Sequence, residues 1–128
     1  MTTTVRMFVN GQAMSGGSLN HALRDARLIG AVRTAAAYRF YSVRDEFPGL
    51  HPVTEGGAAI NGEVYEVSYE ELRERLLPEE PAELELGVIA LEDGTGSFSM
   101  RMRATALTAP DVVDITAHGG WHAYLATL

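Results

Sequence analysis

The segment MFVNGQAMSGGSLN, residues 7–20, passes from an apolar run into a neutral, glycine-rich stretch and contains no charged residue. Residues 4–10 are rich in β-branched and aromatic side chains, which predicts a strand. Asn10-Gly11 then indicates a turn, and Gly16 and Gly17 add two further glycines. The segment is therefore either a simple turn or a cradle whose backbone N–H groups face a ligand.

Further strands are predicted on both sides of a glycine- and proline-rich loop. Pro48-Gly49, Pro52 and Gly56-Gly57 predict that loop over residues 47–57. Asp93-Gly94 predicts a turn between two paired strands. The predicted strands cover residues 26–34, 37–44, 58–67, 84–94 and 97–107.

Two helices are predicted, and strands outnumber them. Ser68 and Glu71 form a Ser-x-x-Glu capping box, and Pro78 should end the helix that they begin. A short second helix is indicated by an apolar stripe near the C-terminus, at Trp121, Tyr124, Leu125 and Leu128. We therefore expect one α+β domain over residues 1–128, with a curved or closed sheet and a largely buried Trp121.

The composition excludes several classes of function. The chain has no cysteine, which excludes disulfides and thiolate chemistry, and its ten basic residues are all arginine, which excludes Schiff-base catalysis and a P-loop. A net charge of -7 without a basic stripe argues against binding to nucleic acid or to an anionic membrane surface. The N-terminus has no basic region followed by an apolar block, so a cytoplasmic location is expected.

The sequence predicts neither a metal site nor a cofactor. His118 and His122 are spaced i,i+4 as in a zinc-binding helix, but no glutamate stands beside His118 and no third ligand follows. Acid–base chemistry has one candidate region, where Glu79, Glu80 and Glu83 crowd a turn. If one of these carboxylates is buried, it can act as a general base. If none is buried, the turn is a solvated loop.

Six blocks of the sequence can be compared with known families: FVNGQAMSGGSLN (8–20), YRFYSV (38–43), PGLHPV (48–53), GGAAINGEVYEV (56–67), LELGVIALEDG (84–94) and DITAHGGWHAYL (114–125). In order and spacing they resemble the C-terminal domain of allophanate hydrolase, over residues 7–125. GEVYEV, residues 62–67, also occurs in the wider γ-glutamylcyclotransferase-like superfamily. The resemblance implies a small mixed β-barrel with flanking short helices and a ligand cavity at the barrel mouth.

The resemblance also implies roles for particular positions. In the full enzyme an amidase domain hydrolyses allophanate, a product of urea carboxylation, and the C-terminal domain acts on the carboxylated intermediate or supports assembly. This chain has no Ser-Ser-Lys arrangement, so it does not carry the amidase step. The family's proposed catalytic histidine falls on Ala13. The glutamate that cyclotransferases use after the helix falls near Glu79, Glu80 or Glu83.

Two hypotheses remain open. In the first, the chain is a binding or auxiliary module that holds a small anionic or ureido molecule or docks onto an amidase subunit. In the second, it is an enzyme of γ-glutamylcyclotransferase type, or one that acts on a carboxylated urea. Ala13 and a solvated glutamate turn favour the first hypothesis, the binding module. The sequence leaves open whether the chain forms a homo-oligomer. The predicted ligand-binding residues are Asn10, Gly11, Gln12, Ala13, Met14, Asn20, Tyr38 and Tyr41.

Overall fold

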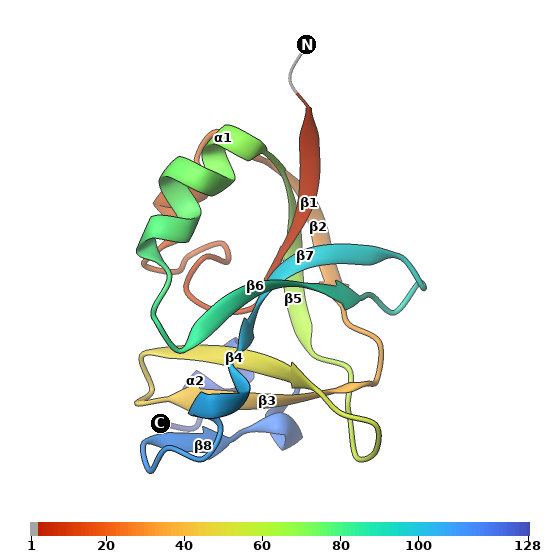
Figure 1. The fold of residues 1–128 in the computed structure, drawn as a ribbon, viewed down its shortest axis with the longest axis vertical. Coiled ribbons are helices and arrows are strands. Elements are labelled where there is room, and N and C mark those ends of the chain that lie inside the picture. Colours follow the sequence, from red (N-terminus) through yellow and green to blue (C-terminus); the bar gives the residue numbers. More distant parts are fainter. Residues whose placement is uncertain (1–2) are drawn as a thin grey trace.

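The computed structural model describes residues 3–128, and within them eight strands form one curled mixed sheet (Figure 1). The strand order is β2-β5-β1-β7-β4-β3-β8, and β6 is added to the sheet by pairing with β7. The strands are β1 (Thr4–Val9), β2 (Arg27–Arg33), β3 (Tyr38–Val43), β4 (Phe47–Pro52), β5 (Asn61–Ser68), β6 (Leu84–Ala90), β7 (Gly96–Met102) and β8 (Val112–Asp114).

The sheet curls into a half-barrel around β1. This strand runs antiparallel to β5 and parallel to β7, and β7 in turn forms an antiparallel hairpin with β6. A single antiparallel bridge between Thr34 and Leu91 brings the end of β2 against the end of β6. The predicted α+β class is therefore confirmed, with a curled mixed sheet and a few short helices.

The predicted helix after β5 is present. Three consecutive segments form it: α1 (Tyr69–Glu71), the π-helical η2 (Leu72–Leu76) and the 3-10 helix η3 (Leu77–Glu79). The capping box is confirmed, since the Glu71 N–H donates to Ser68 Oγ at 3.1 Å and the Ser68 N–H donates to Glu71 Oε1 at 3.1 Å. Among the described residues, no helix combines the length and the apolar character that crossing a bilayer would require.

The loop predicted over residues 47–57 is wrong in its first half, where β4 pairs antiparallel with β3. Two prolines and a glycine are unusual in a strand, because proline cannot donate to a ladder. β4 tolerates them because it pairs with β7 at only one position, Leu50 with Arg101, so few backbone N–H donors are needed along that edge. Burial of Leu50, which is fully inaccessible to solvent, holds the strand in place.

Trp121 packs into the core as predicted, whereas Leu128, the last residue of the predicted apolar stripe, is 69% exposed. Trp121 begins α2 (Trp121–Leu125) and is only 1% exposed. Gly119 precedes it with φ +75, a left-handed conformation that other residues rarely adopt. Its carbonyl accepts a hydrogen bond of 2.8 Å from the Asn61 N–H, which ties the tail to β5.

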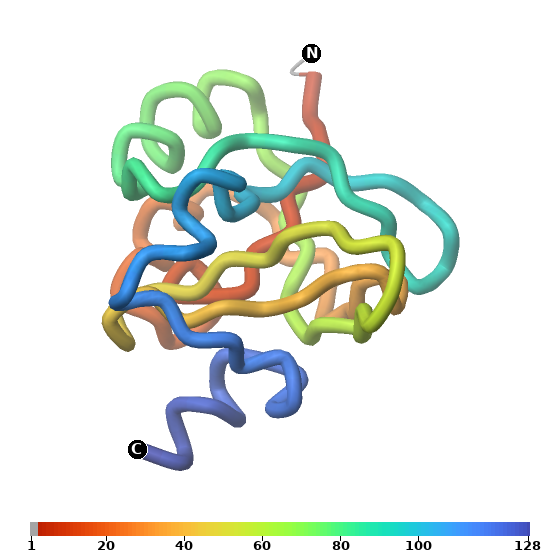
Figure 2. Tube along the Cα trace, turned by 60° about the horizontal axis from the view of Figure 1, so that its bottom comes forward, coloured from red at the N-terminus to blue at the C-terminus, as the bar shows by residue number. Residues whose placement is uncertain are grey.

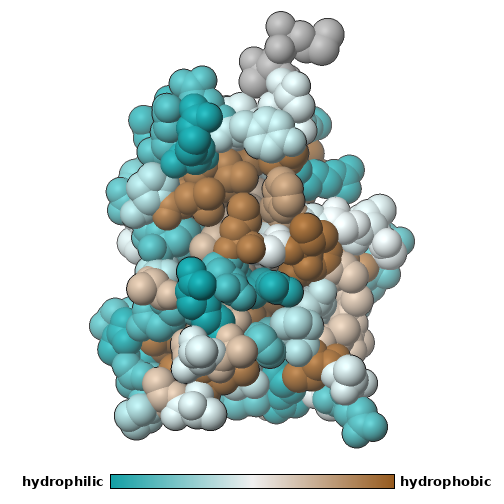
Figure 3. All heavy atoms as spheres, in the orientation of Figure 1, coloured by the Kyte–Doolittle hydropathy of each residue, from teal (hydrophilic) through white to brown (hydrophobic). Residues whose placement is uncertain are grey.

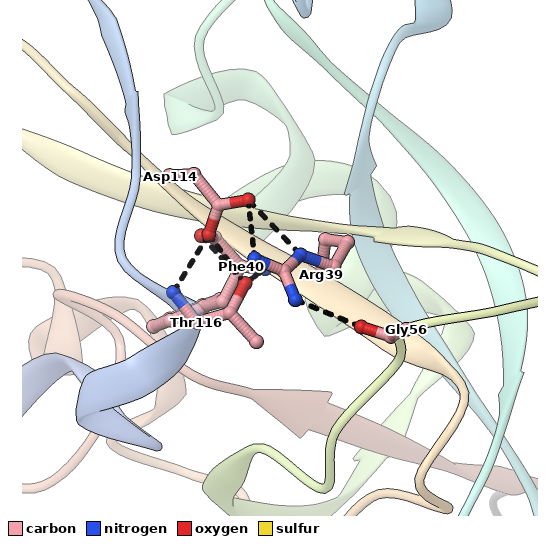
Figure 4. Close-up of polar contacts among 5 residues, drawn as sticks. All are labelled: Arg39, Phe40, Gly56, Asp114 and Thr116. Carbon is pink, nitrogen blue, oxygen red and sulfur yellow. Dashed lines mark hydrogen bonds and ion pairs between the residues drawn. The ribbon is translucent and has the colours of Figure 1, made fainter.

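A polar network fastens the tail to β3 (Figure 4). Asp114 Oδ2 accepts hydrogen bonds from Arg39 Nε at 3.0 Å and from Nη2 at 2.8 Å, while Oδ1 accepts one of 2.6 Å from the Thr116 hydroxyl. The Phe40 N–H donates to Thr116 Oγ1 at 2.8 Å, and Arg39 Nη1 donates to the Gly56 carbonyl at 2.8 Å. The block DIT, residues 114–116, is thus a structural clamp.

One face of the β6–β7 hairpin is apolar and open to solvent. Leu86 and Val88 on β6 are 38% and 63% exposed. They stand opposite Met100 and Phe98 on β7. Figure 3 shows hydrophobic side chains gathered over these two strands, between hydrophilic surfaces above and below.

Candidate functional site

The glycine-rich loop, the end of the helical segment and the β3–β4 turn enclose a cavity of about 310 Å³. These segments are far apart in sequence, yet they lie together on the left of Figures 1 and 2. The lining residues from β1 are apolar, and most of the polar lining residues come from the surrounding loops and the end of the helical segment. The lining residues are Met7, Phe8, Val9, Asn10, Gly11, Gln12, Ala13, Ser18, Leu19, Arg44, Glu46, Phe47, Pro48, Glu79, Glu80, Pro81, Leu84, Ser99 and Met100.

The loop after β1 holds its shape through its own backbone. The Leu19 N–H donates to the Gln12 carbonyl at 2.9 Å, and the Met14 N–H donates to the Gly11 carbonyl at 3.1 Å. Gly17 permits this close approach, since a Cβ there would lie 2.0 Å from the Gln12 carbonyl oxygen. Within residues 3–128 the N–H groups of Gly11, Gln12 and Ala13 have no acceptor. Three free donors therefore stand where the loop borders the cavity.

The Asn10 side chain is buried beside the loop. The residue is 8% exposed, and its Nδ2 atom is closed to solvent without a hydrogen-bond partner in the described part of the chain. Gln12 supports the loop: its Oε1 accepts from the Ser18 N–H at 3.3 Å, and its Nε2 donates to the Glu46 carbonyl at 3.5 Å. An unsatisfied buried donor costs about 1–3 kcal/mol, so Asn10 lowers the local stability of the loop.

The remaining predicted ligand-binding residues lie outside the lining. Met14 is buried in the core, and Asn20 supports the loop by donating from Nδ2 to the Ala13 carbonyl at 2.8 Å. Tyr38 is buried, and its hydroxyl accepts from the Ala90 N–H at 2.8 Å. Tyr41 packs against a separate apolar cluster with Val43. The wall predicted from these tyrosines is instead formed by Arg44, Phe47 and Pro48.

The three candidate glutamates differ in their surroundings. Glu79 and Glu80 line the cavity, whereas Glu83 does not and pairs with Arg44 Nη1 at 2.9 Å. Glu79 is exposed. Glu80 is partly buried, and burial raises the pKa of its carboxyl group to about 7. The expectation that this turn is uniformly solvated is therefore wrong for Glu80.

Arg44 is the cation of the cavity lining, and its place there was not predicted from the sequence. It occupies a tight turn, with φ 54, and is followed by Asp45 with φ 57. Its guanidinium pairs with Asp111 at 2.8 Å and with Glu46 at 3.4 Å, in addition to Glu83. The sequence changes after Arg44 from a segment rich in arginine to one rich in acidic residues, which marks this position. Placing Arg44 beside the cavity also requires β4 to be recognised as a strand, because Arg44 lies in the turn between β3 and β4.

The structure offers no evident metal centre. Across residues 3–128, no three histidine, aspartate or glutamate side chains gather in a geometry that could hold an ion. His118 lies in the 3-10 helix η5 (Thr116–His118), and His122 lies in α2. The two histidines belong to separate elements on either side of Gly119.

The half-barrel with a loop-lined cavity defines a γ-glutamylcyclotransferase-like fold. A solved gamma-glutamyl cyclotransferase shares this fold, with a TM-score of 0.53 and 10% identity over 79% of this chain and 68% of that one. Within that fold class, this chain belongs to the allophanate hydrolase C-terminal domain family, whose model matches residues 5–126. The family expected from the sequence blocks is thus confirmed.

The relatives include one protein of similar size and several much longer ones. The structure of c4763, a uropathogenic E. coli-specific protein, is 30% identical with a TM-score of 0.90, and 98% of each chain is covered. The structure of Kluyveromyces lactis allophanate hydrolase is 28% identical with a TM-score of 0.90, covering 98% of this chain and 21% of that one. The urea amidolyase of Saccharomyces cerevisiae is 28% identical over 134 residues, which are 99% of this chain and 7% of the yeast protein.

Proposed function

We propose that this domain binds a small molecule with a carboxylate or ureido group in the cavity beneath the loop after β1. The observation that carries the proposal is the set of N–H groups of Gly11, Gln12 and Ala13, which have no acceptor within residues 3–128 and belong to residues that line the cavity. Such consecutive N–H groups can donate to a ligand oxygen. A concave, mostly apolar site with a few convergent polar groups is typical of small-molecule binding.

Ligand-observed NMR with a panel of ureas, amides and short carboxylates tests this proposal. Ala13→Phe places a large side chain in the lining and should abolish the binding signals. Ala126→Phe is the matched control, because Ala126 is exposed on the C-terminal segment and outside the lining. Signals that survive Ala13→Phe in a folded variant would place binding elsewhere and refute the proposal.

A second candidate function is acid–base catalysis on such a ligand, and the pKa of Glu80 favours it. A carboxyl group with a pKa of about 7 exchanges protons efficiently at neutral pH. The purified protein would be incubated with a carboxylated urea or a γ-glutamyl amino acid, while ammonia, carbon dioxide and 5-oxoproline are followed. If the domain is a catalyst, Glu80→Gln should abolish turnover. Glu79→Gln, a change at the exposed neighbouring residue, should leave turnover intact.

A third candidate function is support of an amidase subunit in urea or amide nitrogen metabolism. It is favoured by the relatives, in which the matched region is a small part of larger proteins named allophanate hydrolase and urea amidolyase. Size-exclusion chromatography of this chain with an allophanate hydrolase amidase domain lacking its own C-terminal domain tests it. Separate elution at micromolar concentrations would contradict this function.

A further inference from the structure

β6 presents an unprotected edge of the sheet. It pairs with β7 along one side, and on its other side the strand pairing seen within residues 3–128 is the single bridge between Thr34 and Leu91, just beyond its end. An unpaired edge is a template for another strand, so natural sheets protect their edges with charges, bulges or short strands. The segment Leu86-Gly87-Val88 carries no charge, and its register with β7 is regular.

The edge strands at the two ends of the strand order, β2 and β8, are protected. β2 has a register shift between Leu28 and Gly30 and an exposed arginine at each end. β8 is only three residues long and ends at the charged Asp114. β6 is seven residues long, and its central part has none of these features. It is therefore the edge to which another strand can be added.

The backbone groups of Leu86 and Val88 point away from β7. Residues of an antiparallel pair alternate between those that bond to the partner strand and those whose N–H and C=O face outward. The Arg103 N–H donates to the Glu83 carbonyl at 2.9 Å, so the odd-numbered residues of β6 bond to β7 and the even-numbered ones face outward. Among residues 3–128 the N–H groups of Leu86 and Val88 have no acceptor.

The outward groups at both ends of β6 are already in use. At the start of the strand, the Leu84 N–H donates to the Pro81 carbonyl at 3.1 Å. At its end, the Ala90 N–H donates to the Tyr38 hydroxyl at 2.8 Å. The free edge is therefore a window centred on Gly87, with one outward-facing residue on each side of it.

This window is complementary to itself. When two copies of β6 run antiparallel about a two-fold axis at Gly87, Leu86 of one copy stands opposite Val88 of the other, and each such pair can exchange both of its backbone hydrogen bonds. The two side chains, which are 38% and 63% exposed, then cover their counterparts across the new pair. Glu85 stands opposite Ile89 of the other copy, so like charges do not face each other.

The charge around the window also suits a second copy, although the chain has a net charge of -7. Glu85 is paired with Arg103 at 3.0 Å and with Arg101 at 3.9 Å. The Arg101 side chain lies across Gly87, where a Cβ would lie 2.3 Å from its Nε. Two copies therefore meet where acidic and basic groups are nearly balanced, and an uncharged strand is favoured over a strongly charged peptide.

We propose that two copies of this chain associate through β6, in a symmetric antiparallel pair that joins the two sheets edge to edge. The pair uses the free window of both copies, so the assembly closes as a dimer. Leu86, Gly87 and Val88 lie outside the cavity lining, and the dimer is independent of ligand binding. The contact is short, so we expect a weak dimer that forms at roughly 100 µM protein.

Sedimentation equilibrium of the full chain between about 10 and 500 µM tests the dimer. The mass of the parent should rise towards twice the monomer mass and not beyond it. Val88→Lys puts a charge into the window and should keep the chain monomeric. Val113→Lys is the matched control, because Val113 is 56% exposed on β8, and it should leave the dimer intact. A monomeric parent, growth beyond a dimer, or loss of the dimer in Val113→Lys would overturn the proposal.

Val88→Pro separates pairing of the edges from packing of the apolar faces. It keeps an apolar side chain and removes an N–H that β7 does not use, so the dimer should be lost while the hairpin remains. A dimer that survives in this variant would overturn the edge pairing.

Hydrogen exchange of the parent gives a second measurement that requires no substitution. The Leu86 and Val88 amides should exchange about fivefold or more slowly at about 500 µM than at about 10 µM. Exchange that is independent of concentration at these two amides would overturn the proposal.

Discussion

Replacing Glu80 by glutamine should stabilise the protein, and only at neutral and alkaline pH. Burial raises the pKa of Glu80 from 4.5 to about 7, so the folded state holds the proton more tightly than the unfolded chain. Stability is therefore lost as the pH rises from the ordinary value of this carboxyl group towards 7. At about 1.4 kcal/mol per pH unit, ionising Glu80 in the folded protein costs about 3 kcal/mol. Glutamine cannot ionise and avoids that cost.

Urea denaturation at about pH 5 and about pH 8 measures this effect. Glu80→Gln should unfold with a free energy close to that of the parent at the lower pH and about 2–3 kcal/mol higher at the upper one. Glu79→Gln is the matched control, because Glu79 lines the same cavity but is exposed. Arg44 and Glu46 line the cavity too and are unchanged in both variants. Equal stability of parent and Glu80→Gln at both pH values would refute the buried-carboxyl argument.

Three further predictions concern the C-terminal segment, residues 114–121. Trp121→Ala should cost about 3–5 kcal/mol of unfolding free energy, because the side chain is 1% exposed, and an unchanged thermal midpoint would contradict this. Partial burial of Asp114 acts to raise its pKa, but hydrogen bonds from Thr116 and Arg39 lower it overall. The stability advantage of the parent over Asp114→Asn in urea melts should therefore shrink as the pH falls below about 4, and a constant advantage would count against it. Gly119→Ala should lower stability by about 1 kcal/mol in calorimetry because φ is +75, whereas an unaltered melt would show that the turn relaxes freely.

The sequence predicted the elements whose signals are local. The capping box of Ser68 and Glu71 requires only four residues, and the structure confirms it. The family, the α+β class and the buried Trp121 were also predicted from sequence blocks. β4 was missed, because proline and glycine indicate a loop locally, while a long-range contact between Leu50 and β7 makes the segment a strand.

The lining of the cavity was predicted in part for the same reason. Residues 10–13 line the cavity because the loop that follows a strand is a local feature. Burial of Glu80 depends instead on how the helix end meets the first loop and the β3–β4 turn, which no short window of sequence shows. The tyrosines were misplaced as cavity walls because an aromatic strand does not reveal which of its faces borders a cavity.

The lack of a histidine at Ala13 does not by itself remove acid–base chemistry from this cavity. The resemblance implies an imidazole on the loop side, where this chain has a methyl group and free N–H donors. On the helix side Glu80 has a pKa of about 7, close to the ordinary value of the missing imidazole. Proton exchange is most efficient when the pKa lies near the working pH. A single ionisation near pH 7 should therefore govern ligand binding if the domain is a binding module, and turnover as well if it is an enzyme. In either case Glu80→Gln should abolish that pH dependence, because the other lining carboxylates, Glu46 and Glu79, are exposed to solvent.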